Sequence, residues 1–112
     1  MDKLDWLFDM QLKFQKALGY DKFFDGGKDN QEWLETMLIA CMDELMEMIR
    51  ETPWKPWKQQ QKYNKAKVQD ELVDLLHFFI NLCLLAGMDS QLLFEKYLFK
   101  HKVNYKRQQD GY

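Results

Sequence analysis

An acidic residue stands where an apolar one is expected in each of two helical stretches of this 112-residue chain, and this feature constrains its fold most. In the segment DELMEMIRE, Glu44 falls on the same helical stripe as Cys41 and Met48, because successive helix residues turn by about 100°. Glu47 lies one turn further on, at the edge of that stripe. A carboxylate on such a face needs a partner inside the fold, because burying an unpaired charge costs several kcal/mol.

The same arrangement recurs in the segment DELVDLLHFFINL. Glu71 lines up there with Leu75 and Phe78 on the apolar stripe, and Asp74 follows one turn on. A polar edge runs beside this stripe and consists of Asp70, Asp74, His77 and Asn81. Four inward carboxylates need a cation between them, and an all-oxygen ligand set suits a hard ion such as Mg²⁺, or Mn²⁺.

Two other interpretations of the acids stay open. A carboxylate-bridged di-iron site needs a Glu-x-x-His pair on each of two helices, and only Asp74 with His77 comes close. The acids would otherwise pair with lysines or face solvent, as most surface acids do. Recurrence of the pair on two apolar stripes favours the divalent metal.

Hydrophobic periodicity predicts four helices, and no segment alternates with period two as a strand would. Asn30 is the predicted N-cap of the second helix, and Asp89 or Ser90 that of the fourth. The predicted helices cover approximately residues 4–19, 30–51, 62–86 and 90–108. The breaks between them fall on Gly26, Gly27, Pro53, Pro56 and Gly87. We therefore expect one all-α domain over residues 1–112, a four-helix domain with up-down connections.

Composition narrows the classes of partner. A net charge of −2 gives no reason to expect nucleic-acid or membrane-surface binding. The longest apolar run is interrupted by His77 and Asn81, which makes it too short and too polar to span a bilayer. The mixed, acidic N-terminus is unlike a signal peptide, and Cys41 and Cys83 fit reduced core thiols, so a cytoplasmic protein is expected. Apolar residues spread beyond one stripe on the second and third helices, which predicts a homodimer at least, or a dimer of dimers.

The acid pairs on consecutive helices resemble those of the all-α nucleoside-triphosphate pyrophosphohydrolases, the superfamily that includes MazG and the dimeric dUTPases. Four segments resemble the dimeric dUTPase branch in particular: DMQ at 9–11, KPWK at 55–58, DELVDLLHFFINL at 70–82 and KHKVNYKRQQDGY at 100–112. The resemblance runs from about residue 4 to the end of the chain. It implies a MazG-like four-helix bundle that completes its core by homodimerisation, and a bacterial or phage-encoded role in cleaning the nucleotide pool.

The resemblance also implies an activity, the Mg²⁺-dependent hydrolysis of dUTP to dUMP and pyrophosphate. Glu44, Glu47, Glu71 and Asp74 would hold the metal, and Glu47 would orient or deprotonate the attacking water. The residues implied to bind the nucleotide are Gln11 at the uracil edge, Trp57 against base or sugar, His77, Asn81 and Asn104 around deoxyribose and base, and Lys58, Arg107 and Tyr112 at the phosphates.

Two alternatives to dUTP hydrolysis remain. Uracil and cytosine differ at position 4, and buried amides that read this edge reject the wrong base strongly. Because the chain is short for the dUTPase branch and has His101 where that branch often has Asn, the nearer alternative is a MazG-like enzyme for another nucleotide such as dCTP. The other is a non-enzymatic helical interaction module, which would show neither turnover nor stabilisation by metal.

Overall fold

The computed structural model describes residues 1–24, 29–59 and 62–111, and it confirms the predicted all-α class with four helices. No strand occurs in these described ranges. The elements in chain order are α1 (Lys3–Ala17), the short 3-10 helix η1 (Asp21–Phe23), α2 (Asn30–Ile49), α3 (Lys65–Leu85) and α4 (Ser90–Gln109). Each predicted helix end lies within about three residues of the observed one, as expected for boundaries predicted from periodicity.

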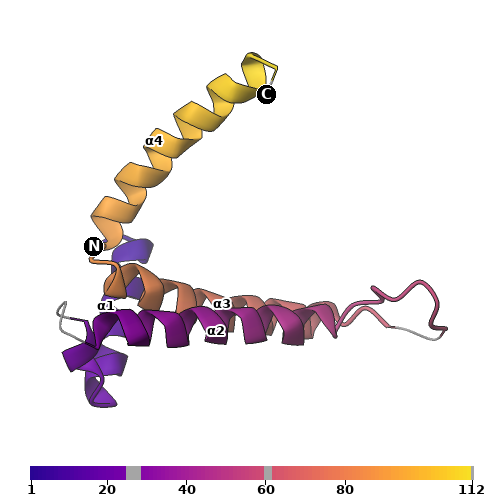
Figure 1. Cartoon of the computed structure of the whole chain (residues 1–112), viewed down its shortest axis with the longest axis horizontal. Coiled ribbons are helices and arrows are strands. Elements are labelled where there is room, and N and C mark those ends of the chain that lie inside the picture. The colour runs from indigo at the N-terminus through magenta and orange to yellow at the C-terminus, as the bar shows by residue number, and fades with distance from the viewer. Residues whose placement is uncertain (25–28, 60–61, 112) are drawn as a thin grey trace.

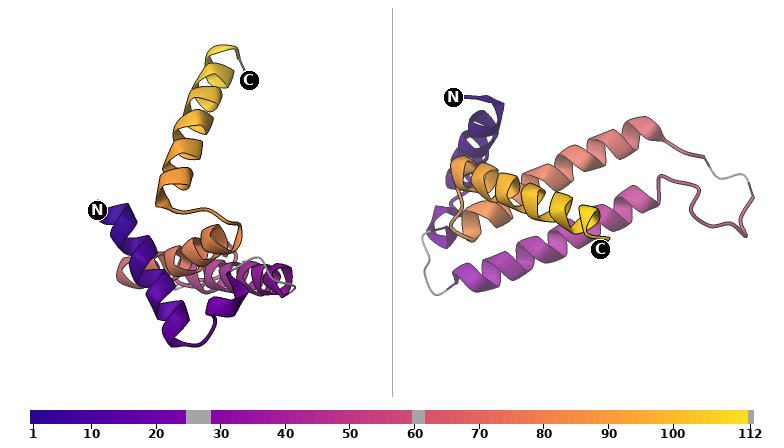
Figure 2. Two further views of the ribbon diagram at one scale, coloured as in Figure 1. Left: turned by 90° about the vertical axis from the view of Figure 1, so that its left-hand side faces the viewer. Right: turned by 90° about the horizontal axis from the view of Figure 1, so that it is seen from above.

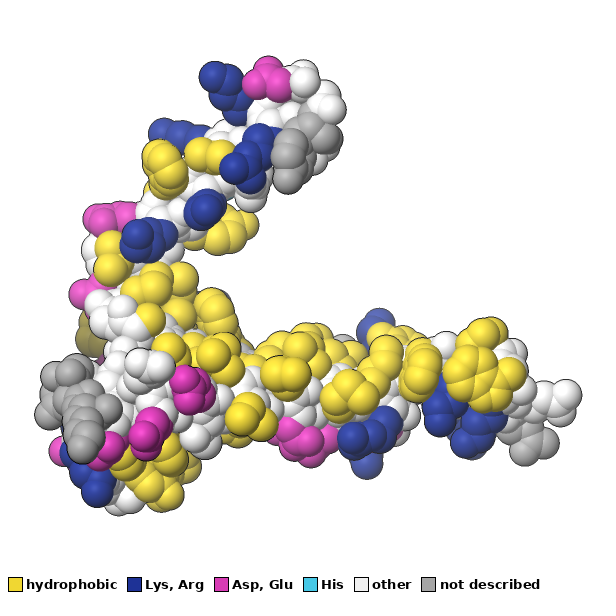
Figure 3. Space-filling model, viewed as in Figure 1, with side chains coloured by type: hydrophobic (Ala, Val, Ile, Leu, Met, Phe, Trp, Pro, Cys, Tyr) yellow, Lys and Arg dark blue, Asp and Glu magenta, His cyan; other side chains and the backbone are white. Residues whose placement is uncertain are grey.

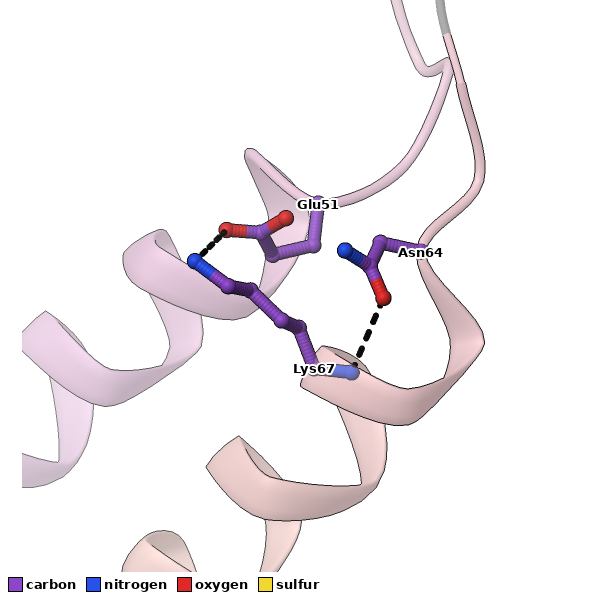
Figure 4. A network of polar contacts seen from close by, with 3 residues as sticks. All are labelled: Glu51, Asn64 and Lys67. Carbon is purple, nitrogen blue, oxygen red and sulfur yellow. Dashed lines mark hydrogen bonds and ion pairs between the residues drawn. The ribbon is translucent and has the colours of Figure 1, made fainter.

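Helices α2 and α3 lie side by side as an antiparallel pair, and α1 crosses this pair near one end (Figures 1 and 2). At the other end of this pair, a hydrogen bond joins the residue before α3 to the chain that follows α2. The backbone N–H of Asn64 donates to the backbone carbonyl of Glu51 at 2.9 Å. The Asn64 side chain caps α3 by accepting from the backbone N–H of Lys67 at 3.2 Å (Figure 4). The Lys67–Glu51 ion pair at 3.9 Å is exposed and contributes below about 1 kcal/mol.

The predicted N-cap role of Asn30 is wrong. Asp29 precedes the helix, makes no capping bond with its side chain, and leaves Asn30 as the first helical residue. The Asn30 amide instead donates to the carbonyls of Phe23 at 2.7 Å and Leu85 at 3.3 Å. Asn30 therefore connects η1 and the end of α3 to the start of α2. Its side-chain amide makes these contacts with other elements instead of capping its own helix. The predicted breaker Gly26–Gly27 lies outside the described residues.

Helix α4 leaves the rest of the chain at an angle (Figures 1 and 2). Gly87, with a φ of +78°, provides the turn after α3, and Asp89 caps α4 as predicted by accepting from the Leu92 N–H at 2.8 Å. The Ser90 hydroxyl donates to the Asp5 carboxylate and so joins the start of α4 to the start of α1. Among the described residues no single helix has the length and apolar character of a membrane span; α3 and α4 meet that measure only when taken together across their 98° bend.

The chain buries little of its apolar surface on its own. Its radius of gyration is 17.4 Å, whereas a compact domain of this length has one of about 13 Å. Hydrophobic side chains cover the side of α2 and α3 that faces the open angle beneath α4 (Figure 3). Only five hydrophobic side chains are buried among the described residues: Phe8, Met37, Ile80, Cys83 and Leu85.

Candidate active site

The acid pairs of α2 and α3 meet where these helices pack together. Glu44, Glu47 and Glu71 each offer a carboxylate oxygen, and these three oxygens lie within 4.8 Å of one another. The Oε2 atoms of Glu44 and Glu71 are enclosed and have no hydrogen-bond partner. An enclosed acceptor without a donor costs about 1–3 kcal/mol, and more if it is charged. A divalent cation bound by oxygen ligands would remove this cost, so the three residues fit a Mg²⁺ or Mn²⁺ site.

Proton affinities reflect the crowding of these carboxylates. Burial, contact with Glu71 and the charges of Glu47 and Asp74 together raise the pKa of Glu44 to about 7. Burial and the charges of Glu71 and Asp43 raise the pKa of Glu47, while Arg50 opposes that rise. A bound cation would reverse both effects, because it favours the ionised form of its ligands.

A cavity of about 340 Å³ lies beside the acid cluster, between α1, α2 and α3. It brings together the predicted base-binding residues Gln11, His77 and Asn81 with Glu44 and Asp74. Asp74 is exposed and lines this cavity, rather than joining the three carboxylates that lie within 4.8 Å. The full lining is Gln11, Phe14, Gln15, Glu44, Asp74, His77, Phe78 and Asn81.

Buried amides form the innermost wall of this cavity. Gln11 is 6% exposed and Asn81 3%, and the Gln11 Nε2 donates to the Asn81 Oδ1 at 2.9 Å. The Asn81 Nδ2 in turn donates to the Met37 Sδ at 3.6 Å. The sequence did not predict this contact, since a sequence pattern does not show which side chains meet across helices.

Gln15 is a cavity residue that sequence reasoning missed. It is 6% exposed, lines the cavity with Gln11, and its side chain has no hydrogen-bond partner among the described residues. The signal was present in the sequence, because residues four apart share one face of a helix. A buried, unpartnered amide on the wall of a polar cavity is suited to contact a ligand.

A second cavity, of about 380 Å³, lies at the C-terminal end of α2 and is strongly basic. Its cationic lining residues are Arg50, Lys55, Lys58 and Lys62. Lys58 was predicted to contact phosphates, and the structure places it here. Trp57 does not line this cavity; it is 73% exposed and packs edge-on against Trp54 with ring centroids 5.9 Å apart.

Two of the remaining predicted residues, Asn104 and Arg107, do not line either cavity. Asn104 and Arg107 belong to α4, and no α4 residue lines either cavity in the described part of the chain. Tyr112 lies outside the described residues. If the active site includes the predicted C-terminal residues, another copy of the chain would therefore have to supply them.

Four helices and the carboxylates of Glu44, Glu47 and Glu71 are the features expected of the all-α nucleoside-triphosphate pyrophosphohydrolase class. A sequence model of the dUTPase family matches residues 3–91, and the chain belongs to this family, in its dimeric dUTPase-like branch. The predicted resemblance is confirmed.

Two curated relatives are the dCTP pyrophosphatases of Enterobacteria phages LZ5 and T4, which are 35% and 34% identical to this chain over 71 residues. The alignments cover 53% of this chain and 41% and 42% of the two relatives, so the chain matches less than half of either relative's length. No solved structure matches the chain.

Proposed function

We propose that this chain hydrolyses a pyrimidine deoxynucleoside triphosphate to the monophosphate and pyrophosphate, with Mg²⁺ as cofactor. The observation that carries the proposal is the cluster of Glu44, Glu47 and Glu71, with enclosed unpartnered oxygens, beside a cavity walled by buried amides. Membership of the dUTPase family supports dUTP, the substrate predicted from the sequence, and the names of the phage relatives support dCTP. The setting would be the nucleotide pool in the cytoplasm of a bacterial or phage-infected cell.

The order of groups along α2 supports a nucleotide as the ligand. Glu44 borders the amide-lined cavity, Glu47 follows one turn on, and Arg50 borders the basic cavity one turn beyond that. These positions span roughly 9 Å along the helix axis. A nucleotide with its base in the first cavity would thus place its inner phosphate at the carboxylates and its terminal phosphates towards the lysines.

The carboxylates would serve two tasks in the reaction. When bound by Glu44, Glu47 and Glu71, with Asp74 as a further ligand beside the substrate, Mg²⁺ would neutralise the triphosphate charge and polarise the phosphoryl oxygens. Glu47 is the proposed general base, because its carboxylate lies within 4.8 Å of the other proposed metal-binding oxygens and so beside a water that the metal would activate.

The bond changes follow from the position of Glu47 beside the proposed phosphate site. Glu47 takes a proton from water as the water oxygen bonds to the α-phosphorus. The bond from that phosphorus to the α–β bridging oxygen breaks, and pyrophosphate leaves with this oxygen. Arg50 and Lys58 compensate the charge of the leaving pyrophosphate.

We further propose that the chain acts as a homodimer or a dimer of dimers. The hydrophobic side chains beneath α4, and those of α4 itself, are left uncovered in one chain (Figure 3). Exposed apolar surface of this extent marks an interaction site. A second copy would cover it and would supply the predicted C-terminal contacts Asn104, Arg107 and Tyr112, while Trp57 would cover the base or sugar from the exposed connection.

Product analysis by ³¹P NMR tests this function directly. The protein is incubated with Mg²⁺ and each of dCTP, dUTP, dTTP, dATP and dGTP, alongside the variants Glu47→Gln and Glu35→Gln. Glu35 is an exposed carboxylate on the same helix and serves as the matched control. The expected result is monophosphate and pyrophosphate from a pyrimidine nucleotide, lost in Glu47→Gln and kept in Glu35→Gln.

Other outcomes would contradict the proposal in different ways. Release of pyrophosphate from purine nucleotides as fast as from pyrimidines would keep the chemistry and refute the substrate class. A folded protein that turns over none of the five nucleotides, and whose melting temperature is unchanged by Mg²⁺, would be a helical interaction module instead.

A further inference from the structure

We infer that Met37, acting through Asn81, orients the Gln11 amide so that its carbonyl oxygen faces the base, and that this orientation selects cytosine over uracil. The inference rests on the proposed function, since it concerns the substrate of that same site. Met37 would then position the residue that reads the base. It lies on α2, the helix that also contains the proposed metal-binding residues Glu44 and Glu47.

The chemistry of the thioether fixes the first amide. A methionine sulfur accepts hydrogen bonds and donates none. The Asn81 side chain, which is 3% exposed, therefore turns its Nδ2 towards the Met37 Sδ, at 3.6 Å. The reverse orientation would set the Asn81 Oδ1 against the sulfur, two acceptors with no hydrogen between them.

The orientation of Asn81 then determines that of Gln11. With the Asn81 Oδ1 directed at Gln11, only a donor satisfies it, and the Gln11 Nε2 provides one at 2.9 Å. The Gln11 Oε1 accepts no hydrogen bond from the described residues. Unlike the enclosed oxygens of Glu44 and Glu71, it retains access to the cavity that Gln11 lines.

The geometry of a pyrimidine nucleotide brings position 4 of the base to this oxygen. The sugar is attached at N1, opposite C4 across the ring, so the group on C4 reaches deepest when the phosphates stay at the carboxylates. Gln11 and Asn81 are among the least exposed residues of the cavity wall. Cytosine carries an amino donor at position 4, and uracil carries a carbonyl acceptor.

Cytosine therefore satisfies the Gln11 Oε1, whereas uracil leaves two acceptors facing each other. One buried polar group left unsatisfied corresponds to a difference of about 10- to 100-fold in binding. Because discrimination between substrates is a ratio of kcat/KM values, the wild-type protein should favour dCTP over dUTP by about that factor.

The test measures kcat/KM for dCTP and for dUTP in the full-length protein with Mg²⁺. Met37→Leu removes the sulfur acceptor with little change of volume, a swap that costs below about 1.5 kcal/mol. Both amides then lose their fixed orientation, and the dCTP-to-dUTP ratio should fall by about tenfold or more. Met42→Leu, on the same helix but 64% exposed, is the control and should leave the ratio unchanged. Gln11→Met, which removes the acceptor itself, should abolish the preference.

The outcomes separate this inference from the function on which it rests. Preference of the wild-type protein for dUTP would overturn the inference and leave the hydrolase intact. A folded Met37→Leu protein with an unchanged dCTP-to-dUTP ratio would do the same. Absence of turnover of both nucleotides would refute the proposed function itself.

Discussion

Replacement of Glu71 by Gln is expected to stabilise the metal-free protein and at the same time to remove its response to Mg²⁺. The carboxyl of Glu71 contacts Glu44, whose pKa is raised from 4.5 to about 7. A rise of this size corresponds to about 3 kcal/mol of unfavourable interaction when Glu44 is ionised. Part of it reflects burial and the other acids, and partial access to solvent screens the rest, so Glu71→Gln should recover roughly 1–2 kcal/mol. The Gln amide can also donate to the enclosed Glu44 Oε2.

The pH dependence has a defined sign. Glu44 keeps its proton in the native state to a higher pH than in the unfolded chain, where its pKa is near 4.5. Below about pH 4.5 Glu44 is protonated in both the native and the unfolded state, so it does not lower the free energy of unfolding. As pH rises from about 4.5 through about 7, the unfolded chain binds fewer protons than the native state, so the stability of the metal-free protein falls. The raised pKa of Glu47 adds in the same direction.

Differential scanning calorimetry of the wild type, Glu71→Gln and the control Glu35→Gln, at about pH 5 and about pH 8, tests both statements. Protein concentration is held constant, because oligomerisation makes the melting temperature depend on it. With EDTA at the higher pH, Glu71→Gln should melt about 4–8 °C above the wild type for each kcal/mol gained. Mg²⁺ should raise the melting temperature of the wild type and of Glu35→Gln only. A Glu71→Gln protein that is less stable than the wild type in EDTA, or equally stabilised by Mg²⁺, would refute the reasoning.

Three further predictions concern other parts of the molecule. Asn30→Ala should lower the free energy of unfolding by about 1–3 kcal/mol, measured by urea denaturation, because two hydrogen bonds to backbone carbonyls are lost; a change below a few tenths would contradict this. Gln15→Leu should raise the KM of the substrate by about tenfold without lowering the melting temperature, since its buried amide has no partner among the described residues; an unchanged KM would exclude contact with the nucleotide. Phe99→Glu, at a 67% exposed position of α4, should shift the protein towards monomer in sedimentation equilibrium, whereas Lys100→Glu should not; monomeric wild-type protein would refute the dimer.

Features fixed by the geometry of a single helix could be predicted from the sequence. The positions of Glu44 and Glu47 on one helix and Glu71 on another follow from a period of about 3.6 residues, and the structure brings their oxygens within 4.8 Å. Gln11 and Asn81 were named as base-binding residues through the resemblance to the dimeric dUTPases, and they line one cavity.

Features that depend on contacts between distant segments could not be predicted in this way. The hydrogen bond between Gln11 and Asn81 joins residues that are 70 positions apart, and its direction depends on Met37, 44 positions from Asn81. Asn30 shows the same limit, because its amide is used by η1 and α3 rather than by its own helix end. The departure of α4 from the other helices is a third case, since apolar side chains such as Tyr97 and Phe99 stay exposed on it.

The central claim is that Glu44, Glu47 and Glu71 hold a divalent metal, and binding of Mn²⁺ followed by electron paramagnetic resonance tests it most directly. Free Mn²⁺ gives a sharp signal that is lost on binding, so a titration measures occupancy without requiring turnover. The expected result is saturable loss of the signal with the wild type and with Glu35→Gln, competition by Mg²⁺, and no loss with the double variant Glu44→Gln, Glu71→Gln. An undiminished signal with folded wild-type protein, or equal binding by the double variant, would contradict it.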